Sequence, residues 1–211
     1  GLQPGRHAQG FVGQGELMNQ TMVDDVLAFW FGAPDAADYG QARAAWFRKD
    51  DAFDARIRAS FLPEVEAAIA GQRDDWAAIP QGVLALFILL DQFPRNLFRN
   101  TARAFAGDAA ALALAGRVVE QGLDRQLLPV QRVFAYLPFE HSESLADQDR
   151  SIALFAALAD EHHEAASYLD YAHRHRDVIV RFGRFPHRNA ALGRTSTVAE
   201  IDYLAQPGSG F

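Results

Sequence analysis

Hydrophobic residues recur every three or four positions along most of the chain, which is the spacing of one face of an α-helix. The first clear run places Val23, Val26 and Trp30 on one side. We expect this helix to begin at Thr21, because threonine caps helix starts, and to end at Gly32. No stretch alternates in the period-two pattern of a half-buried strand. The pattern therefore predicts an all-helical chain.

The segment 83–90 is apolar at nearly every position, which is typical of a helix buried on all sides. Pro80 suits the first turn of that helix, and Pro94 is expected to end it because proline has no amide hydrogen. Asp108 is then expected to cap the next helix. This part of the chain is predicted to form the centre of the fold.

Later helix starts also have recognisable capping residues. Ser142 or Ser144 precedes an apolar periodic run, and Thr197 with Glu200 forms the pattern of a capping box. Together the signals predict about eight or more helices with short connections, which favours a bundle or a superhelix. No repeat of roughly 34 or 40 residues is visible, so the pattern alone does not identify a helical-repeat protein.

Composition narrows the class of protein further. A chain of 211 residues with 49% hydrophobic residues fits one globular domain. We expect residues 1–21 to be a leader, a tag remnant or a flexible extension, and residues 22–211 to form a single all-helical domain. The chain has no cysteine, which excludes disulfides, thiol nucleophiles and cysteine metal sites. No apolar run approaches the roughly 18 residues of a membrane span. With no secretion-type apolar core at its start, the chain is expected to be cytoplasmic.

Charge is distributed unevenly along the chain. The overall net charge of −7 argues against a dedicated nucleic-acid binder. Residues 174–194, however, contain six arginines and one aspartate, a net charge of +5, so the remainder carries −12. This asymmetry predicts a local surface that attracts anions on an otherwise acidic body.

Three polar clusters interrupt the amphipathic pattern, at 92–99, 137–143 and 181–194. Arginine presents a planar fork of donors suited to carboxylates and phosphates, and the clusters place several arginines near helix ends. The same residues could instead cap helix ends and form structural ion pairs, with Glu140 and Glu143 as acidic partners. The candidate ligand-binding residues are Arg95, Asn96, Arg99, Glu140, His141, Glu143, Arg181, Arg184, His187, Arg188, Asn189 and Arg194.

Histidines beside carboxylates are the candidates for chemistry. His141 or His187 could act as an acid or base with a glutamate such as Glu140 to orient it. His175 falls on the apolar stripe of its helix and is expected to point inward. Adjacent residues do not share a helix face, so neither this cluster nor the run 161–164 has the spacing of a metal site. We predict no metal and no cofactor, and expect 161–164 to form a solvated face.

At these motifs the chain resembles the bacterial domain-of-unknown-function 924 family. The resemblance spans about Val23 to Leu204 and implies a TPR-like all-helical fold, without implying an activity. It rests on the segments VLAFWFG at 26–32, QFPRNLFR at 92–99, AFAGD at 104–108, YLPFEHSE at 136–143 with Gln148, HRDVIVRFGRFPHRN at 175–189 and LGR at 192–194.

Three functions fit these observations. The first is a helical binding module whose Arg/His/Glu groove takes a small anionic molecule or an acidic peptide end. The second is an enzyme that uses His/Glu acid–base chemistry on a phosphate- or carboxylate-bearing substrate, although no Ser–His–Asp order supports a hydrolytic nucleophile. The third is a protein-interaction scaffold without a small ligand. The first two require the three clusters to meet in space, and neither nucleic acid nor a membrane is expected as a partner. The state of homo-oligomerisation is left open.

Overall fold

The computed structural model describes residues 13–211, and within that range every regular element is helical. The α-helices are α1 (Gln14–Phe31), α2 (Asp51–Ile69), α3 (Pro80–Phe87), α4 (Phe93–Leu97), α5 (Asp108–Glu120), α6 (Pro129–Glu140), α7 (Leu145–Glu161), α8 (Ala166–Phe182) and α9 (Val198–Leu204). Short 3₁₀ turns occur in several connections, one of them at Pro186–Arg188. The all-helical prediction is confirmed, and the TPR-like arrangement stays a prediction.

The start of the first helix differs from the prediction. Thr21 does not cap α1, because the helix already begins at Gln14 and the Thr21 hydroxyl donates a hydrogen bond to the carbonyl of Leu17. The boundary expected after residue 21 therefore falls inside this helix, while residues 1–12 of the expected leader lie outside the described residues. The end of α1 is as predicted, since Gly32 has a positive φ of 87°.

The central helix does not stop at Pro94 as expected. α3 passes into a π turn, Ile88–Gln92, and then into α4, which contains Pro94. In the π turn the amide of Phe93 bonds to the carbonyl of Ile88, five residues back. This wider turn lets the helix continue past the proline. The predicted burial is confirmed, because every residue of 83–90 is buried.

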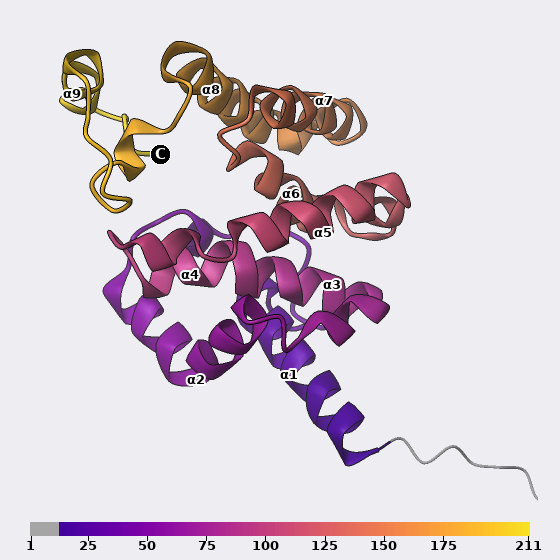
Figure 1. Cartoon of the computed structure of the whole chain (residues 1–211). Coiled ribbons are helices and arrows are strands. Elements are labelled where there is room, and N and C mark those ends of the chain that lie inside the picture. Colours follow the sequence, from indigo (N-terminus) through magenta and orange to yellow (C-terminus); the bar gives the residue numbers. More distant parts are fainter. Residues whose placement is uncertain (1–12) are drawn as a thin grey trace, which may run out of the picture.

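Each helix packs mainly against one that is next or next but one in the chain. Helices α1 and α2 lie against α3 and α4, α5 packs on α6, and α6, α7 and α8 follow one another. Figure 1 shows α1–α4 at one end, α5 and α6 in the middle, and α7–α9 at the other end. One large core joins α1 to α8, and a smaller cluster of Val178, Ile179 and Phe185 lies near the C-terminal end of α8.

Capping explains where the later helices begin. Thr197 and Glu200 form the predicted capping box of α9, in which each side chain bonds to the other residue's amide. Ser144 precedes α7, but its side chain makes no capping bond. Asp108 is the first residue of α5 and not its cap, which is Gly107. The Asp108 carboxylate is therefore available for contacts outside its own helix.

Candidate functional site

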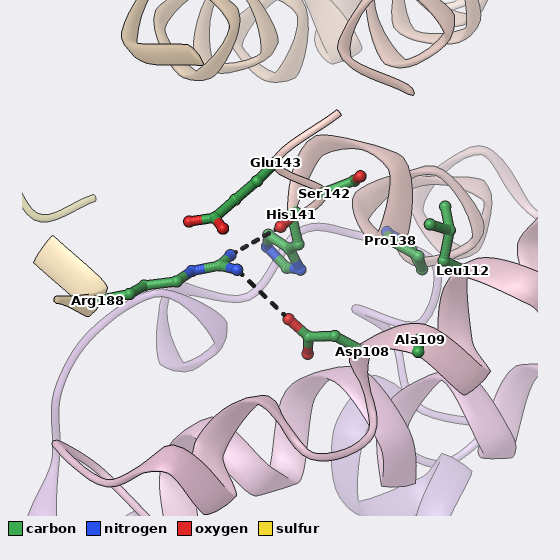
Figure 2. A pocket seen from close by; sticks show the side chains of 8 residues that line it. All are labelled: Asp108, Ala109, Leu112, Pro138, His141, Ser142, Glu143 and Arg188. Carbon is green, nitrogen blue, oxygen red and sulfur yellow. Dashed lines mark hydrogen bonds and ion pairs between the residues drawn. The ribbon is translucent and has the colours of Figure 1, made fainter. Parts of the chain in front are cut away.

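A small open recess lies where the start of α5, the end of α6 and the 3₁₀ turn at Pro186–Arg188 come together (Figure 2). Its volume is about 210 Å³. The lining residues are Asp108, Ala109, Leu112, Pro138, His141, Ser142, Glu143 and Arg188. Members of the second and third polar clusters thus share one surface.

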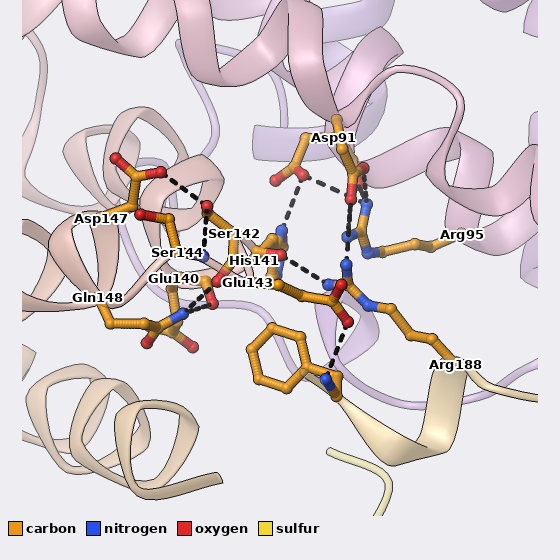
Figure 3. Close-up of polar contacts among 12 residues, drawn as sticks. Asp91, Arg95, Glu140, His141, Ser142, Glu143, Ser144, Asp147, Gln148 and Arg188 are labelled. Atoms are coloured by element: carbon orange, nitrogen blue, oxygen red, sulfur yellow. Dashed lines mark hydrogen bonds and ion pairs between the residues drawn. The ribbon is translucent and has the colours of Figure 1, made fainter. Parts of the chain in front are cut away.

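The imidazole of His141 is held by a buried carboxylate. Its Nδ1 lies 2.7 Å from Oδ1 of Asp91, a residue in the π turn that is only 1% exposed (Figure 3). The amide nitrogen of Gln92 donates to the other carboxylate oxygen at 3.0 Å. Because an ionised carboxylate only accepts hydrogen bonds, Nδ1 carries the hydrogen in the neutral ring. The opposite nitrogen, Nε2, has no partner among the described residues and is not fully enclosed by protein atoms.

Opposing effects act on the pKa values of Asp91 and His141. Burial alone would raise the pKa of Asp91, but the charges of His141 and Arg95 and the hydrogen bonds from His141 and Gln92 lower it below its usual value. Burial lowers the pKa of His141, Arg95 acts in the same direction, and Asp91 opposes both. The pair therefore consists, near pH 7, of a carboxylate and a neutral imidazole.

Arg95 joins the π turn to α5. Its guanidinium donates two parallel hydrogen bonds to the Asp108 carboxylate, at 2.8 and 3.0 Å, and a third to the carbonyl of Asp91 at 2.7 Å. Such a two-pronged pair fixes both orientation and distance. Arg95 thus positions the two aspartates of the site, and its charge is already matched by them.

The other polar residues of the first cluster lie elsewhere. Asn96 donates to Asp54 of α2 at 2.8 Å, and Arg99 donates to the same carboxylate at 2.7 and 3.1 Å. These contacts tie α4 to α2. The structure does not bring Asn96 or Arg99 to the recess, and their contacts are those of helix-packing residues.

Arg188 has a less complete set of partners than Arg95. It is 7% exposed, and one terminal nitrogen donates to the carbonyl of His141 at 2.8 Å. The nearest carboxylate oxygen, on Asp108, is 3.7 Å from its other terminal nitrogen, and its buried Nε has no partner among the described residues. The guanidinium lies over the rings of Phe105 and Phe185, each centroid 4.7 Å away. Burial and the charge of Arg95 lower the pKa of Arg188 to about 10, so it is a cation at neutral pH.

Glu143 holds the segment after α8 against the end of α6. It accepts two hydrogen bonds from the Arg194 guanidinium, at 2.9 and 3.0 Å, and one from the amide of Phe185 at 2.8 Å. Arg194 also donates to the side-chain oxygen of Asn189 at 3.0 Å. The predicted pairing of Glu143 with an arginine is confirmed. Arg194 and Asn189 position this wall of the recess.

The remaining arginines of the third cluster lie away from the recess. Arg184 donates two hydrogen bonds to the Glu200 carboxylate, at 2.8 and 2.9 Å, which fastens α9 to the preceding loop. Arg181 lies over the rings of Phe182 and Tyr203 on an exposed face. The positive charge concentrated in this stretch of sequence is therefore spread over several structural contacts.

Glu140 faces the opposite way from its neighbour His141. It is 3% exposed, its Oε1 lies 3.0 Å from Nδ1 of His175, and its Oε2 has no partner among the described residues. Burial, and secondarily the charge of Asp91, raises the pKa of Glu140 to about 8. His175 points inward as predicted, donates to the carbonyl of Tyr171 at 2.8 Å, and has a pKa lowered to about 3, chiefly by burial. Both side chains are uncharged at neutral pH.

His187 precedes Arg188 in the 3₁₀ turn and does not line the recess. Its ring packs against Phe185, with centroids 5.7 Å apart, and its buried Nδ1 has no partner among the described residues. Burial and the charge of Arg188 lower the pKa of His187 to about 4. Of the three candidate acid–base residues, His141, Glu140 and His187, His141 alone lines the recess.

Asp91 and Asp108 are site residues that the sequence reasoning missed. Asp91 is a single acid at the end of a long apolar run, and such an isolated charge in a buried helix was the available signal. Asp108 was assigned to a helix cap, which accounted for it without a tertiary partner. The predicted solvated run 161–164 is confirmed as mostly exposed.

Comparison with known proteins places the chain in a class of helical proteins from bacteria. The model of the family described as "Bacterial protein of unknown function (DUF924)" matches residues 26–208, and the chain belongs to this family. A solved structure, that of the protein of unknown function ATU0120 from Agrobacterium tumefaciens, is 38% identical. The match covers 89% of this chain and 98% of that one, with a TM-score of 0.77. No curated protein matches the chain. Within residues 13–211, no helix combines the length and apolar character needed to cross a membrane.

Proposed function

We propose that this protein binds a small anionic molecule in the recess, with Arg188 as the residue that contacts the anion. The observation that supports this proposal is that the arginines differ in how completely they are paired with carboxylates. Arg95 and Arg194 each hold a carboxylate with two short hydrogen bonds, whereas Arg188 lies 3.7 Å from its nearest carboxylate and has an unpartnered Nε. A buried cation with unused donors gains more from an anionic ligand than one already paired.

The meeting of the clusters supports a ligand site over a scaffold without a ligand. Arg95 from the first cluster, His141 from the second and Arg188 from the third are linked through Asp91 and Asp108. His141 and Arg188 line the open recess, and Arg95, which is not a lining residue, holds the Asp108 carboxylate that also lines it. The volume of about 210 Å³ is below the range of roughly 300–1,000 Å³ typical of drug-sized ligands. A small carboxylate or phosphate therefore suits the recess better than a long acidic peptide.

Thermal unfolding with added anions tests this proposal. Phosphate, acetate and glycolate would each be compared with chloride at equal ionic strength. A ligand at about 100 times its Kd stabilises a protein by roughly 2.7 kcal/mol, which raises the Tm by about 2–4 °C at this size. We expect the Arg188→Gln variant to lose the shift and the matched variant Arg181→Gln to keep it. Arg188→Lys, which keeps the charge but loses the planar fork, should keep part of it.

Two outcomes would contradict the proposal. One is a wild-type protein whose Tm follows ionic strength alone, and the other is an anion-specific shift that survives in Arg188→Gln. Circular dichroism of each variant at low temperature establishes that the helices are retained before the shifts are compared.

A further inference from the structure

The two nitrogens of His141 have different hydrogen-bonding roles. Nδ1 donates to Asp91, whose carboxylate can only accept, so the neutral ring presents Nε2 as an acceptor. Arg188 presents donors only. A ligand that satisfies both groups must therefore combine an anionic oxygen for the guanidinium with a hydrogen-bond donor for the imidazole.

The two groups are close enough to be used by one small ligand. A terminal nitrogen of Arg188 lies 2.8 Å from the backbone carbonyl oxygen of His141, and both side chains line the same recess. Figure 2 shows the guanidinium and the imidazole side by side above the Asp108 carboxylate. The donor of the ligand must then lie within a few bonds of its anionic group.

The charged groups around His141 balance one another. Asp91 and Arg95 face it from the central helix, Asp108 from α5 and Arg188 from the 3₁₀ turn. His175 of α8, whose ring centroid is 6.4 Å away, and His187 of the 3₁₀ turn are further titratable neighbours, and Glu143 lines the same recess with Arg194 as its partner. Three carboxylates oppose three guanidiniums. The imidazole therefore lacks the excess of negative charge that would keep it protonated at neutral pH.

We propose that the recess selects an anion that also carries a hydroxyl group, such as a small hydroxy acid, and that Nε2 of His141 accepts the hydrogen bond of that hydroxyl. This proposal rests on the anion site of Arg188. Asp91 is the positioning residue, since it contacts the imidazole and not the ligand.

Glycolate and acetate form a matched pair of probes because they differ by one hydroxyl group. Wild-type protein is expected to bind glycolate about 2- to 10-fold more tightly than acetate, the difference of roughly one hydrogen bond. Calorimetric titration of both anions measures this ratio. The preference should disappear in His141→Phe and shrink in Asp91→Asn, which lets the ring adopt the opposite tautomer. His173→Phe, which alters an exposed histidine of α8, is the matched control and should keep the wild-type ratio.

The pH dependence provides a readout that a purely structural role would not give. Once His141 is protonated at low pH, Nε2 becomes a charged donor that attracts the carboxylate of either anion, so the preference for glycolate should shrink while both anions still bind. Nitrogen-15 NMR of the protein, with His141 assigned through its variant, should show a protonated Nδ1 and an unprotonated Nε2 at pH 7. A proton on Nε2 at that pH would overturn the proposal.

The outcomes separate this inference from the proposed function. If neither anion binds, or binding survives in Arg188→Gln, the anion site is wrong. If both anions bind through Arg188 with equal affinity, the anion site stands and the hydroxyl selection is wrong. If the ratio favours glycolate but is unchanged in His141→Phe and in Asp91→Asn, the role of His141 as the acceptor is wrong. Asp91→Asn keeps the shape of the side chain, so it remains informative if His141→Phe fails to fold.

Discussion

A β-carbon on Gly107 would lie 2.1 Å from the carbonyl oxygen of Leu90. That carbonyl is four residues before Pro94, which has no amide hydrogen to give it. The backbone of Gly107 packs against this carbonyl instead. The carboxylate of the next residue, Asp108, then accepts a hydrogen bond from Arg95. We expect Gly107→Ala to destabilise the protein by about 1–3 kcal/mol, because backbone must move, as measured by urea unfolding.

Gly116 is the matched control for this substitution. It lies inside α5, and no atom would be within 4 Å of an added β-carbon. Gly116→Ala should leave stability unchanged or raise it by up to ~1 kcal/mol, since alanine favours helix interiors. Equal effects of the two substitutions would show that the contact with Leu90 is not what requires glycine at 107.

Glu143 is expected to control the local stability of the segment after α8. Glu143→Ala removes the acceptor of the Phe185 amide and of Arg194. Hydrogen exchange should become faster at the amide of Phe185 and across the segment 183–211, while the core of α3 and α6 stays protected. The expected loss of global stability is about 1.5–3 kcal/mol, the range for hydrogen bonds to a charged group. Glu120→Ala, at an exposed carboxylate, should leave this exchange pattern unaltered.

The pH dependence of stability should reveal the buried Glu140. With its pKa raised to about 8 in the folded state, Glu140 binds a proton more tightly there than in the unfolded chain. Stability is therefore lost as the pH rises from about 4.5 to about 8. The Glu140→Gln variant cannot ionise at this position. It should be more stable than wild type by roughly a few kcal/mol at pH 9 and about as stable as wild type at pH 4.

His175 contributes in the opposite direction. Its pKa, lowered to about 3 in the folded state, means that the unfolded chain binds more protons between pH 3 and 6.5, so stability rises with pH over that range. Between about pH 4.5 and 6.5 the two slopes cancel, so the two residues together predict a plateau of maximal stability over that range, with losses below and above it. Urea unfolding at several pH values measures the curve. Glu164→Gln, at an exposed glutamate, should reproduce the wild-type curve. An unchanged curve in Glu140→Gln would mean that Glu140 is not protonated when folded.

Tyr136 joins helix α6 to the turn before it. Its hydroxyl donates to the buried carboxylate of Asp124 and accepts from Nε of Arg132 at 3.1 Å. Burial, and then the hydrogen bond with Asp124, raises the pKa of Tyr136 to about 12. Tyr136→Phe should cost about 1–3 kcal/mol, because Asp124 keeps its burial and loses a donor.

Ultraviolet titration offers a second measurement of the same contact. The absorbance step of Tyr136 should appear above pH 11 and be missing in Tyr136→Phe. Tyr171 is half-exposed, so Tyr171→Phe is expected to change stability by no more than about 0.5 kcal/mol. A comparable loss in both variants would argue that the hydroxyl of Tyr136 contributes little.

The fold was predictable where local spacing decides it. The helical class and the burial of 83–90 follow from the apolar pattern, and both are confirmed. The start of α1 was not predictable from Thr21, because a threonine hydroxyl can cap a helix or bond to a carbonyl four residues back within one. The predicted helix ended at Pro94 because proline lacks an amide hydrogen. The π turn that lets the helix continue depends on tertiary contacts and has no sequence signature.

The site was predictable only in part, since its decisive contacts are long-range. His141 and Arg188 stood out as polar residues beside helix breaks. The partner of His141, Asp91, is 50 residues away in sequence, and nothing local relates the two. Glu140 was expected beside an arginine, yet it contacts His175, because successive residues of a helix point to different sides.

The π turn makes the site depend on the length of the central helix as well as on its side chains. Each residue of an α-helix adds a rotation of about 100°. Removing Leu89 alone would let the π turn close into an ordinary α-helical turn and would leave the residues before and after it in nearly their present orientation, because a π turn accommodates one extra residue. A sequence alignment would score such a chain as one gap with every site residue conserved, although the gap marks the loss of the π turn that contains Asp91. For members of this family, the spacing between Pro80 and Asp91 is therefore as informative as the identity of the aspartate.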